Sequence, residues 1–142
     1  MAYSLSYSKS ILVLIFISDK TRRGETEYIS TKVMSELLNI PKPTLSVILN
    51  NLIRAGILQS KEGANGGIRL IKREEDITLL DLLIAIENEK PLFHTNYDLN
   101  VEGTRPDNAK RVVNTALRHA EQTMKEELRQ VSLRQILDSM PL

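Results

Sequence analysis

Apolar residues recur with the period of an α-helix along much of this chain. Around residue 50 they are spaced by three and four, which predicts one buried helical stripe, formed by Leu45, Ile48, Leu49, Leu52 and Ile53. The outward positions carry short hydrogen-bonding groups, one small apolar group and two cations: Lys42, Thr44, Ser46, Val47, Asn50, Asn51 and Arg54. Such a face suits base edges and phosphates, although any surface helix has a polar outer side.

The segments before this helix predict a helix-turn-helix. Residues 5–18 have a broad apolar face and predict a first helix, and the polar stretch Lys20–Glu27 predicts a loop. Ser30 is placed to cap a second helix, and Asn39 tolerates the left-handed conformation that ends one. Pro43 suits the first turn of the third helix. Two short helices joined by a tight turn are typical of a helix-turn-helix, whose second helix is the recognition helix.

A predicted β-hairpin follows the recognition helix. Gly56 suits the helix end, and the strands are expected over Ile57–Glu62 and Ile68–Lys72 around the tip Gly63-Ala64-Asn65-Gly66-Gly67. Glycine and asparagine accept the positive φ that a hairpin tip requires, and the paired glycines would let the backbone approach a phosphate. An ordinary hairpin is the alternative, but its place directly after the helix favours a wing. We therefore predict a mainly α-helical winged helix-turn-helix.

The C-terminal half predicts an apolar helix, a loop and a long helix. Thr78 and Asp81 are spaced to form a capping box before the apolar Leu79–Ile86. The predicted division is a DNA-binding domain over 1–87, a loop over 88–106, and a dimerisation helix with a short C-terminal helix over 107–142. Apolar residues of the long helix predict a dimer seam, centred on Val112, Val113, Ala116, Leu117, Ala120 and Met124. Packing back on its own domain is the alternative for this helix.

Composition and charge narrow the functional classes. Residues 1–73 hold eleven Lys and Arg against five Asp and Glu, a net charge of +6, whereas residues 74–142 carry −5. A basic front half suits a polyanion such as DNA. The chain of 142 residues has no cysteine, which excludes disulfides, thiolate metal sites and iron–sulfur clusters. With two histidines and no catalytic motif, we expect no enzyme, cofactor or metal site. No membrane span or signal peptide is expected, which indicates the cytoplasm.

The stretch from Ile40 to Glu87 resembles the Rrf2 family of bacterial transcription regulators. The resemblance rests on Leu-Ile-Arg-Ala-Gly-Ile-Leu at the end of the recognition helix, Gly-Ala-Asn-Gly-Gly-Ile-Arg-Leu in the wing, and Asp-Ile-Thr-Leu-Leu-Asp before the next helix. It implies a homodimer in which the long helices cross and each head meets half of a near-palindromic operator. Leu92-Phe93-His94 is similar to the cluster-free branch of YwnA type, set apart from the cluster-bearing and thiol-sensing IscR, NsrR and CymR members.

Two departures from the family pattern matter. Its sensing members carry cysteines in the loop before the long helix, and here that loop has none. Glu62 stands before the first wing glycine, where the family usually has Arg, which leaves phosphates to Lys61, Arg69 and backbone amides.

We therefore expect a homodimeric, sequence-specific repressor, with a winged-helix protein-interaction module as the alternative. Two alternatives for regulation remain open. The protein binds a small-molecule effector where the apolar helix, the loop and the long helix converge, or it binds DNA constitutively without a ligand. The predicted DNA-binding residues are Lys42, Thr44, Ser46, Val47, Asn50, Arg54, Lys61, Asn65, Gly66 and Arg69.

Overall fold

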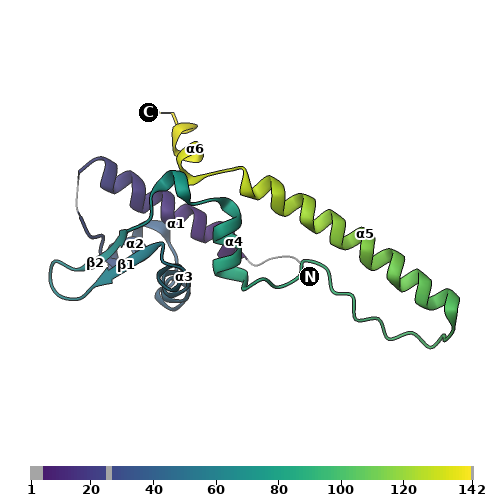
Figure 1. Cartoon of the computed structure of the whole chain (residues 1–142). Helices are drawn as coiled ribbons and strands as arrows, with labels where there is room; N and C mark the ends of the chain where they lie inside the picture. Colours follow the sequence, from purple (N-terminus) through teal and green to yellow (C-terminus); the bar gives the residue numbers. More distant parts are fainter. Residues whose placement is uncertain (1–4, 25–26, 142) are drawn as a thin grey trace.

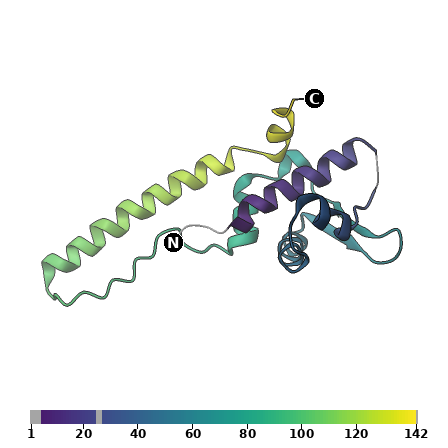
Figure 2. The same ribbon diagram turned by 180° about the vertical axis from the view of Figure 1, so that it is seen from behind.

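A helical head and one long helix that projects from it make up the computed structural model, which describes residues 5–24 and 27–141 (Figures 1 and 2). The elements in chain order are α1 (Leu5–Arg22), α2 (Thr31–Leu38), α3 (Lys42–Arg54), β1 (Leu58–Lys61), β2 (Gly67–Leu70), the 3-10 turn η1 (Glu74–Asp76), α4 (Leu79–Glu87), α5 (Thr104–Arg129) and α6 (Leu133–Asp138). The mainly helical fold with a two-stranded wing confirms the predicted fold class.

Helix α1 lies at the centre of the head and is longer than predicted. Its Val13, Leu14 and Ile17 are fully buried, and α1 packs against α3, α4, α6 and β2. The helix continues to Arg22 instead of ending at residue 18. Its polar last turn faces solvent and is held by an ion pair between Asp19 and Arg23, 3.4 Å apart. Polar residues therefore extend this helix where a loop was expected; Glu25 and Thr26 of that predicted loop lie outside the described residues.

Helices α2 and α3 form the predicted helix-turn-helix. The Ser30 hydroxyl accepts the N–H of Val33 at 3.4 Å, and Asn39 has a φ of 52°, so both predicted helix ends are confirmed. Ser35 closes the turn by donating to the carbonyl of Ile40 at 2.6 Å. Helix α3 begins at Lys42 with proline in its first turn. Four of its five predicted stripe residues are buried, and Ile53 is half-buried.

The wing is an antiparallel pair with a third contact to the body of the head. Leu58 pairs with Leu70 and Lys61 pairs with Gly67, so the strands are shorter than predicted. An isolated bridge joins Ile68 of β2 to Ile29. The N–H of Ile29 donates to the carbonyl of Ile68 at 2.8 Å, and the N–H of Ile68 donates to the carbonyl of Ile29 at 2.9 Å. Ile68 is buried beneath this bridge. The hairpin is therefore fastened to the segment that precedes α2.

Helix α4 begins with the predicted capping box. The Thr78 hydroxyl accepts the N–H of Asp81 at 3.1 Å, and the Asp81 carboxylate accepts the N–H of Thr78 at 2.9 Å. Its Leu80, Leu82, Leu83 and Ile86 side chains are buried, Leu79 and Ala85 are half-buried, and Ile84 is 40% exposed. Tyr7 ties α1 to this helix, because its hydroxyl donates to the carbonyl of Leu79 at 2.7 Å. Partial burial disfavours the phenolate and raises the pKa of Tyr7 to about 12.

Helix α5 projects from the head with the segment before it running alongside (Figures 1 and 2). It begins at Thr104, three residues before the expected start at Asp107, because Pro106 lies in the first turn, where its missing N–H costs nothing. Its 26 residues include none that is buried. At 1.5 Å per residue such a helix is roughly 39 Å long. Among the described residues, no helix is both long enough and apolar enough to cross a membrane.

After α5 the chain returns to the head through α6. The N–H of Leu79 donates to the carbonyl of Val131 at 2.9 Å, and that of Leu133 donates to the carbonyl of Ile77 at 2.8 Å. Leu133 and Leu137 are buried in the same core as α1 and α3. Although α6 follows the long helix in sequence, it packs as part of the head.

We predict that Tyr7→Phe lowers the free energy of unfolding by about 1 kcal/mol at neutral pH, the usual net contribution of one hydrogen bond. Because the folded pKa lies above the ordinary value of 10, the contribution of the hydroxyl is complete below pH 10 and is lost as the pH rises through 12. Urea unfolding of both proteins from pH 7 to 12 measures this. The stability difference should shrink above pH 10, and a constant difference would contradict the assignment.

Candidate nucleic-acid interface

The outer face of α3 is open to solvent and carries the predicted recognition residues. Lys42, Ser46, Val47, Asn50 and Arg54 are exposed, and Thr44 is half-buried. Val47 is an apolar side chain that is 60% exposed, so it is available for an apolar contact with a partner. The opposite face of α3 anchors the helix in the core, so burial there fixes which side chains point outward.

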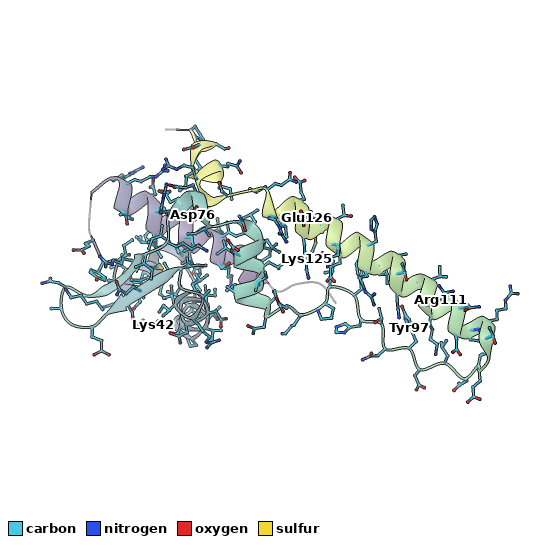
Figure 3. The ribbon with its side chains drawn as sticks, in the orientation of Figure 1. Lys42, Asp76, Tyr97, Arg111, Lys125 and Glu126 are labelled. Atoms are coloured by element: carbon cyan, nitrogen blue, oxygen red, sulfur yellow. The ribbon has the colours of Figure 1, made fainter. Side chains whose placement is uncertain are left out.

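Two cations mark the ends of this face. Lys42 lies in the first turn of α3, on the head and far from Arg111 of α5 (Figure 3). Arg54 lies in the last turn, where its guanidinium donates to the side-chain oxygen of Asn51 at 3.2 Å. That contact orients Arg54 along the helix surface. The positive charges are thus placed where they can contact phosphates on either side of a groove.

The wing tip lies beyond the strands and is exposed. Glu62, Ala64 and Asn65 are all open to solvent, and Gly66 donates its N–H to the carbonyl of Gly63 at 3.0 Å to close the turn. Asn65 is therefore free to meet a partner, with its amide able to donate and accept. Glu62 places a negative charge beside this tip, which disfavours close approach of a phosphate to that side chain.

The two wing glycines are required by the fold itself. A β-carbon on Gly66 would lie 2.1 Å from the carbonyl oxygen of Lys61, and one on Gly67 would lie 2.2 Å from that of Ile29. Gly67 also has a φ of 142°, which L side chains rarely adopt. These glycines let the hairpin turn and touch Ile29, which explains their presence without any contact to a phosphate.

Lys61 and Arg69 share one aromatic ring, that of Tyr28. The Lys61 ammonium lies 5.3 Å from the ring centroid and the Arg69 guanidinium carbon lies 5.2 Å from it. Arg69 also donates to the Gln59 side chain and to the Glu27 carboxylate, each at 2.9 Å. Lys61 and Arg69, which were predicted to contact phosphates, are therefore brought together. Arg69 already has an anionic partner in Glu27.

The predicted seam residues of α5 differ in how far they are exposed. We call the exposed apolar residues Ala109, Val112, Val113, Ala116 and Ala120 the α5 stripe. Val112 is 57% exposed and Val113 is 45% exposed. Leu117 and Met124, which were assigned to the same seam, are instead half-buried within the chain. The long helix thus packs partly on its own chain and still presents an apolar stripe to solvent.

A cavity of about 200 Å³ lies between α5 and the segment that runs beside it. Its lining combines apolar, polar and charged side chains, namely Pro91, Phe93, Thr95, Asn114, Leu117, Arg118 and Glu121. Glu121 closes one side by accepting the backbone N–H of Leu92. The side-chain oxygen of Asn114 is buried and accepts no hydrogen bond from the described residues.

Three residues of these sites were not predicted from the sequence. Glu27 ends the predicted polar loop and Tyr28 follows it, and only the bridge between Ile29 and Ile68 shows that they flank the wing. Asn114 lies on the polar side of a helical pattern, so the sequence holds no sign of its burial. In each case the missing signal is a contact between segments distant in sequence.

Comparison with known proteins gives a consistent result. A family model for Rrf2, described as an iron-dependent transcriptional regulator, matches residues 4–139. The HTH-type transcriptional regulator YffB named in Lactococcus lactis is 31% identical over 140 residues, covering 97% of this chain and 88% of the relative.

Solved structures that share the fold include two named transcription regulators. IscR of T. potens has a TM-score of 0.70 at 18% identity, with 100% of this chain and 93% of that chain covered. The global cysteine regulator CymR of B. subtilis has a TM-score of 0.70 at 23% identity, with 99% of each chain covered. These winged-helix structures confirm the predicted fold class.

Iron binding of the kind that the family description implies does not fit these residues. The sequence has no cysteine to hold an iron–sulfur cluster. Within residues 5–24 and 27–141, no group of three or more His, Asp or Glu side chains could hold a metal ion.

Proposed function

Because this chain belongs to the Rrf2 family and is a DNA-binding transcription regulator, not an enzyme, we propose that it acts as a homodimeric repressor on a near-palindromic operator. The observation that carries the proposal is the solvent-open face of α3 beside a wing that is fastened to the head. An interaction-only winged helix would present an apolar face at this position. We place the protein in the cytoplasm, where bacterial DNA lies.

Base recognition is assigned to the middle of the α3 face. Ser46 and Asn50 offer hydrogen-bonding groups, and Val47 offers an apolar contact for a thymine methyl group. Thr44 borders this set and is half-buried. Lys42, Arg54, Lys61 and Arg69 would contact phosphates, with Asn65 at the wing tip, whereas the N–H of Gly66 is already donated to the carbonyl of Gly63. A dimer held on a promoter by these contacts would exclude other proteins from the same duplex, which is the basis for proposing repression.

The α5 stripe is the proposed dimer seam. Exposed apolar side chains on a projecting helix are unfavourable in water, and a second copy offers a matching stripe. Ala109, Ala116 and Ala120 are small, so two helices could approach closely there. Val112 and Val113 would supply most of the buried apolar area. Leu117 and Met124 would support the seam from within each protomer, because they are already half-buried.

The cavity beside α5 is the proposed effector site. It lies on the loop side of the helix, away from the α5 stripe, so a ligand there would not compete with the second protomer. The buried Asn114 oxygen could accept a hydrogen bond from a ligand, and Arg118 and Glu121 supply opposite charges at the lining. A volume of about 200 Å³ suits a small polar metabolite. By shifting α5, such a ligand could change the spacing of the two recognition helices.

We predict that Ser46→Ala and Val47→Ala each weaken operator binding by about 1–3 kcal/mol and change binding to random duplex much less. The operator would first be selected from a random duplex pool with the wild-type protein. Fluorescence anisotropy on operator and random duplexes then measures both affinities. Lys42→Ala is the matched control, because a lost phosphate contact should weaken binding to both duplexes equally. Equal losses for Ser46→Ala would show that this residue only positions the helix.

We predict that Ala116→Glu converts the dimer to a monomer, because it places a charge in the middle of the apolar seam. Analytical ultracentrifugation at micromolar concentration measures the mass. Gln122→Glu adds the same charge to the exposed surface of α5 away from the stripe and should stay dimeric. A wild-type protein that sediments as a monomer would refute the proposed seam.

We predict that a small polar metabolite shifts operator affinity and that Asn114→Leu removes this response while the ligand-free affinity stays unchanged. Leucine has a similar size but cannot accept the hydrogen bond from a ligand. Titration of a panel of amino acids and small carboxylates against operator binding measures the response. If no member of the panel changes operator affinity, constitutive binding is the better account.

A further inference from the structure

The segment around Tyr28 lies beside β2 as a third neighbour in the wing. Ile29 bridges Ile68, and β1 pairs with β2 so that Gln59 lies opposite Arg69. Tyr28, Arg69 and Gln59 are therefore neighbours in a row across three aligned segments. Because side chains alternate between the two faces of a sheet, this row lies on the side opposite to the buried Ile68. The row faces outward.

The Tyr28 ring holds two cations that would otherwise repel each other. The charged ends of Lys61 and Arg69 both lie within the range in which a cation is attracted to an aromatic face. This attraction keeps two flexible side chains on one patch of the wing. A pair of positive charges held together on a sheet surface is suited to an anion with more than one oxygen.

Glu27 already offers Arg69 such an oxygen. Its carboxylate accepts from the Arg69 guanidinium at 2.9 Å, while the Gln59 side chain accepts from another nitrogen of the same group. The Glu27 side chain is 72% exposed, and that of Arg69 is 37% exposed. Exposed ion pairs of this kind are weak, so a stronger anion can replace the carboxylate at little cost. Gln59 and Tyr28 would hold the guanidinium in place during the exchange.

We propose that Tyr28, Lys61 and Arg69 form a binding site for a backbone phosphodiester of duplex DNA, and that Glu27 occupies it in the free protein. Tyr28 is a positioning residue, which keeps both cations on one patch. Glu27 is a competitor that a phosphate displaces. The inference rests on the proposed DNA-binding function and adds to it an aromatic support and an internal anion that lowers affinity for every sequence.

The decisive variant is Glu27→Gln, which removes the competing charge and keeps the shape of the side chain. We expect it to bind operator and random duplex about two- to fivefold more tightly than the wild type, the scale of one weak exposed ion pair. The slope of log affinity against log salt should become steeper by up to about one unit per protomer. Glu102→Gln changes the net charge equally on an exposed loop residue and should leave both quantities near the wild-type values.

Variants at Tyr28 test the positioning role. Tyr28→Leu should weaken binding to both duplexes about three- to tenfold and make the salt slope shallower, because Lys61 and Arg69 are no longer held together. Tyr28→Phe keeps the ring and should retain the wild-type slope. Circular dichroism at the binding temperature verifies that each variant is folded. If the slope of log affinity against log salt changes in Tyr28→Leu but not in Tyr28→Phe, the ring positions the two cations, and the effect is not a general loss of stability.

The outcomes separate this inference from the proposed function. If the wild-type protein binds no duplex in preference to another, the proposed sequence-specific function fails. If the wild type does bind selectively but Glu27→Gln has the same affinity and salt slope as Glu102→Gln, the proposal that a phosphate displaces Glu27 is wrong. Weaker binding by Glu27→Gln would also overturn it, since that result would mean that the ion pair supports the DNA-bound form.

Discussion

The backbone pairing that joins the start of α4 to the start of α6 determines the shape of the molecule. Leu133 donates to Ile77, Leu79 donates to Val131, and the Leu133 and Leu137 side chains complete the core. This junction holds the C-terminal end of α5 against the head. The rest of α5 therefore projects away from the head. Its other end is reached by the extended segment that follows α4. A projecting helix with an apolar stripe is therefore a consequence of how the chain returns to the head.

The DNA-facing surface depends on a second attachment, between the wing and the segment before α2. Helix α3 is oriented by the four residues that it buries, whereas a two-stranded hairpin is only marginally stable by itself. The bridge between Ile29 and Ile68 supplies the missing third neighbour. Recognition helix and wing are consequently parts of one rigid surface. The same bridge brings Glu27 and Tyr28 beside Arg69, so a feature that stabilises the wing also sets its charge.

Local patterns predicted most of the fold and the outer face of α3. Ser30, Asn39 and Thr78 are helix-end signals that act within a few residues, and each lies where the sequence placed it. Features that depend on contacts between distant segments were not predictable in this way. Leu117 belongs to the apolar pattern of α5 and also lines the cavity beside the loop, and periodicity does not distinguish a self-contact from a seam with another chain, so its place in the seam stays a prediction. The partners of Arg69 were missed because no local pattern links residues 27 and 69.

The close approach of Gly67 to Ile29 divides the hairpin into a part that cannot vary and a part that can. Any side chain at position 67 would collide with backbone, as it would at position 66, and Gly63 has a φ of 105°, which L side chains rarely adopt, whereas Ala64 and Asn65 face open solvent. During divergence of such chains, changes at Ala64 and Asn65 would alter what the tip touches without loosening the hairpin. The surface that the wing tip presents to a partner can therefore change at these two positions while the glycines that shape the hairpin stay the same.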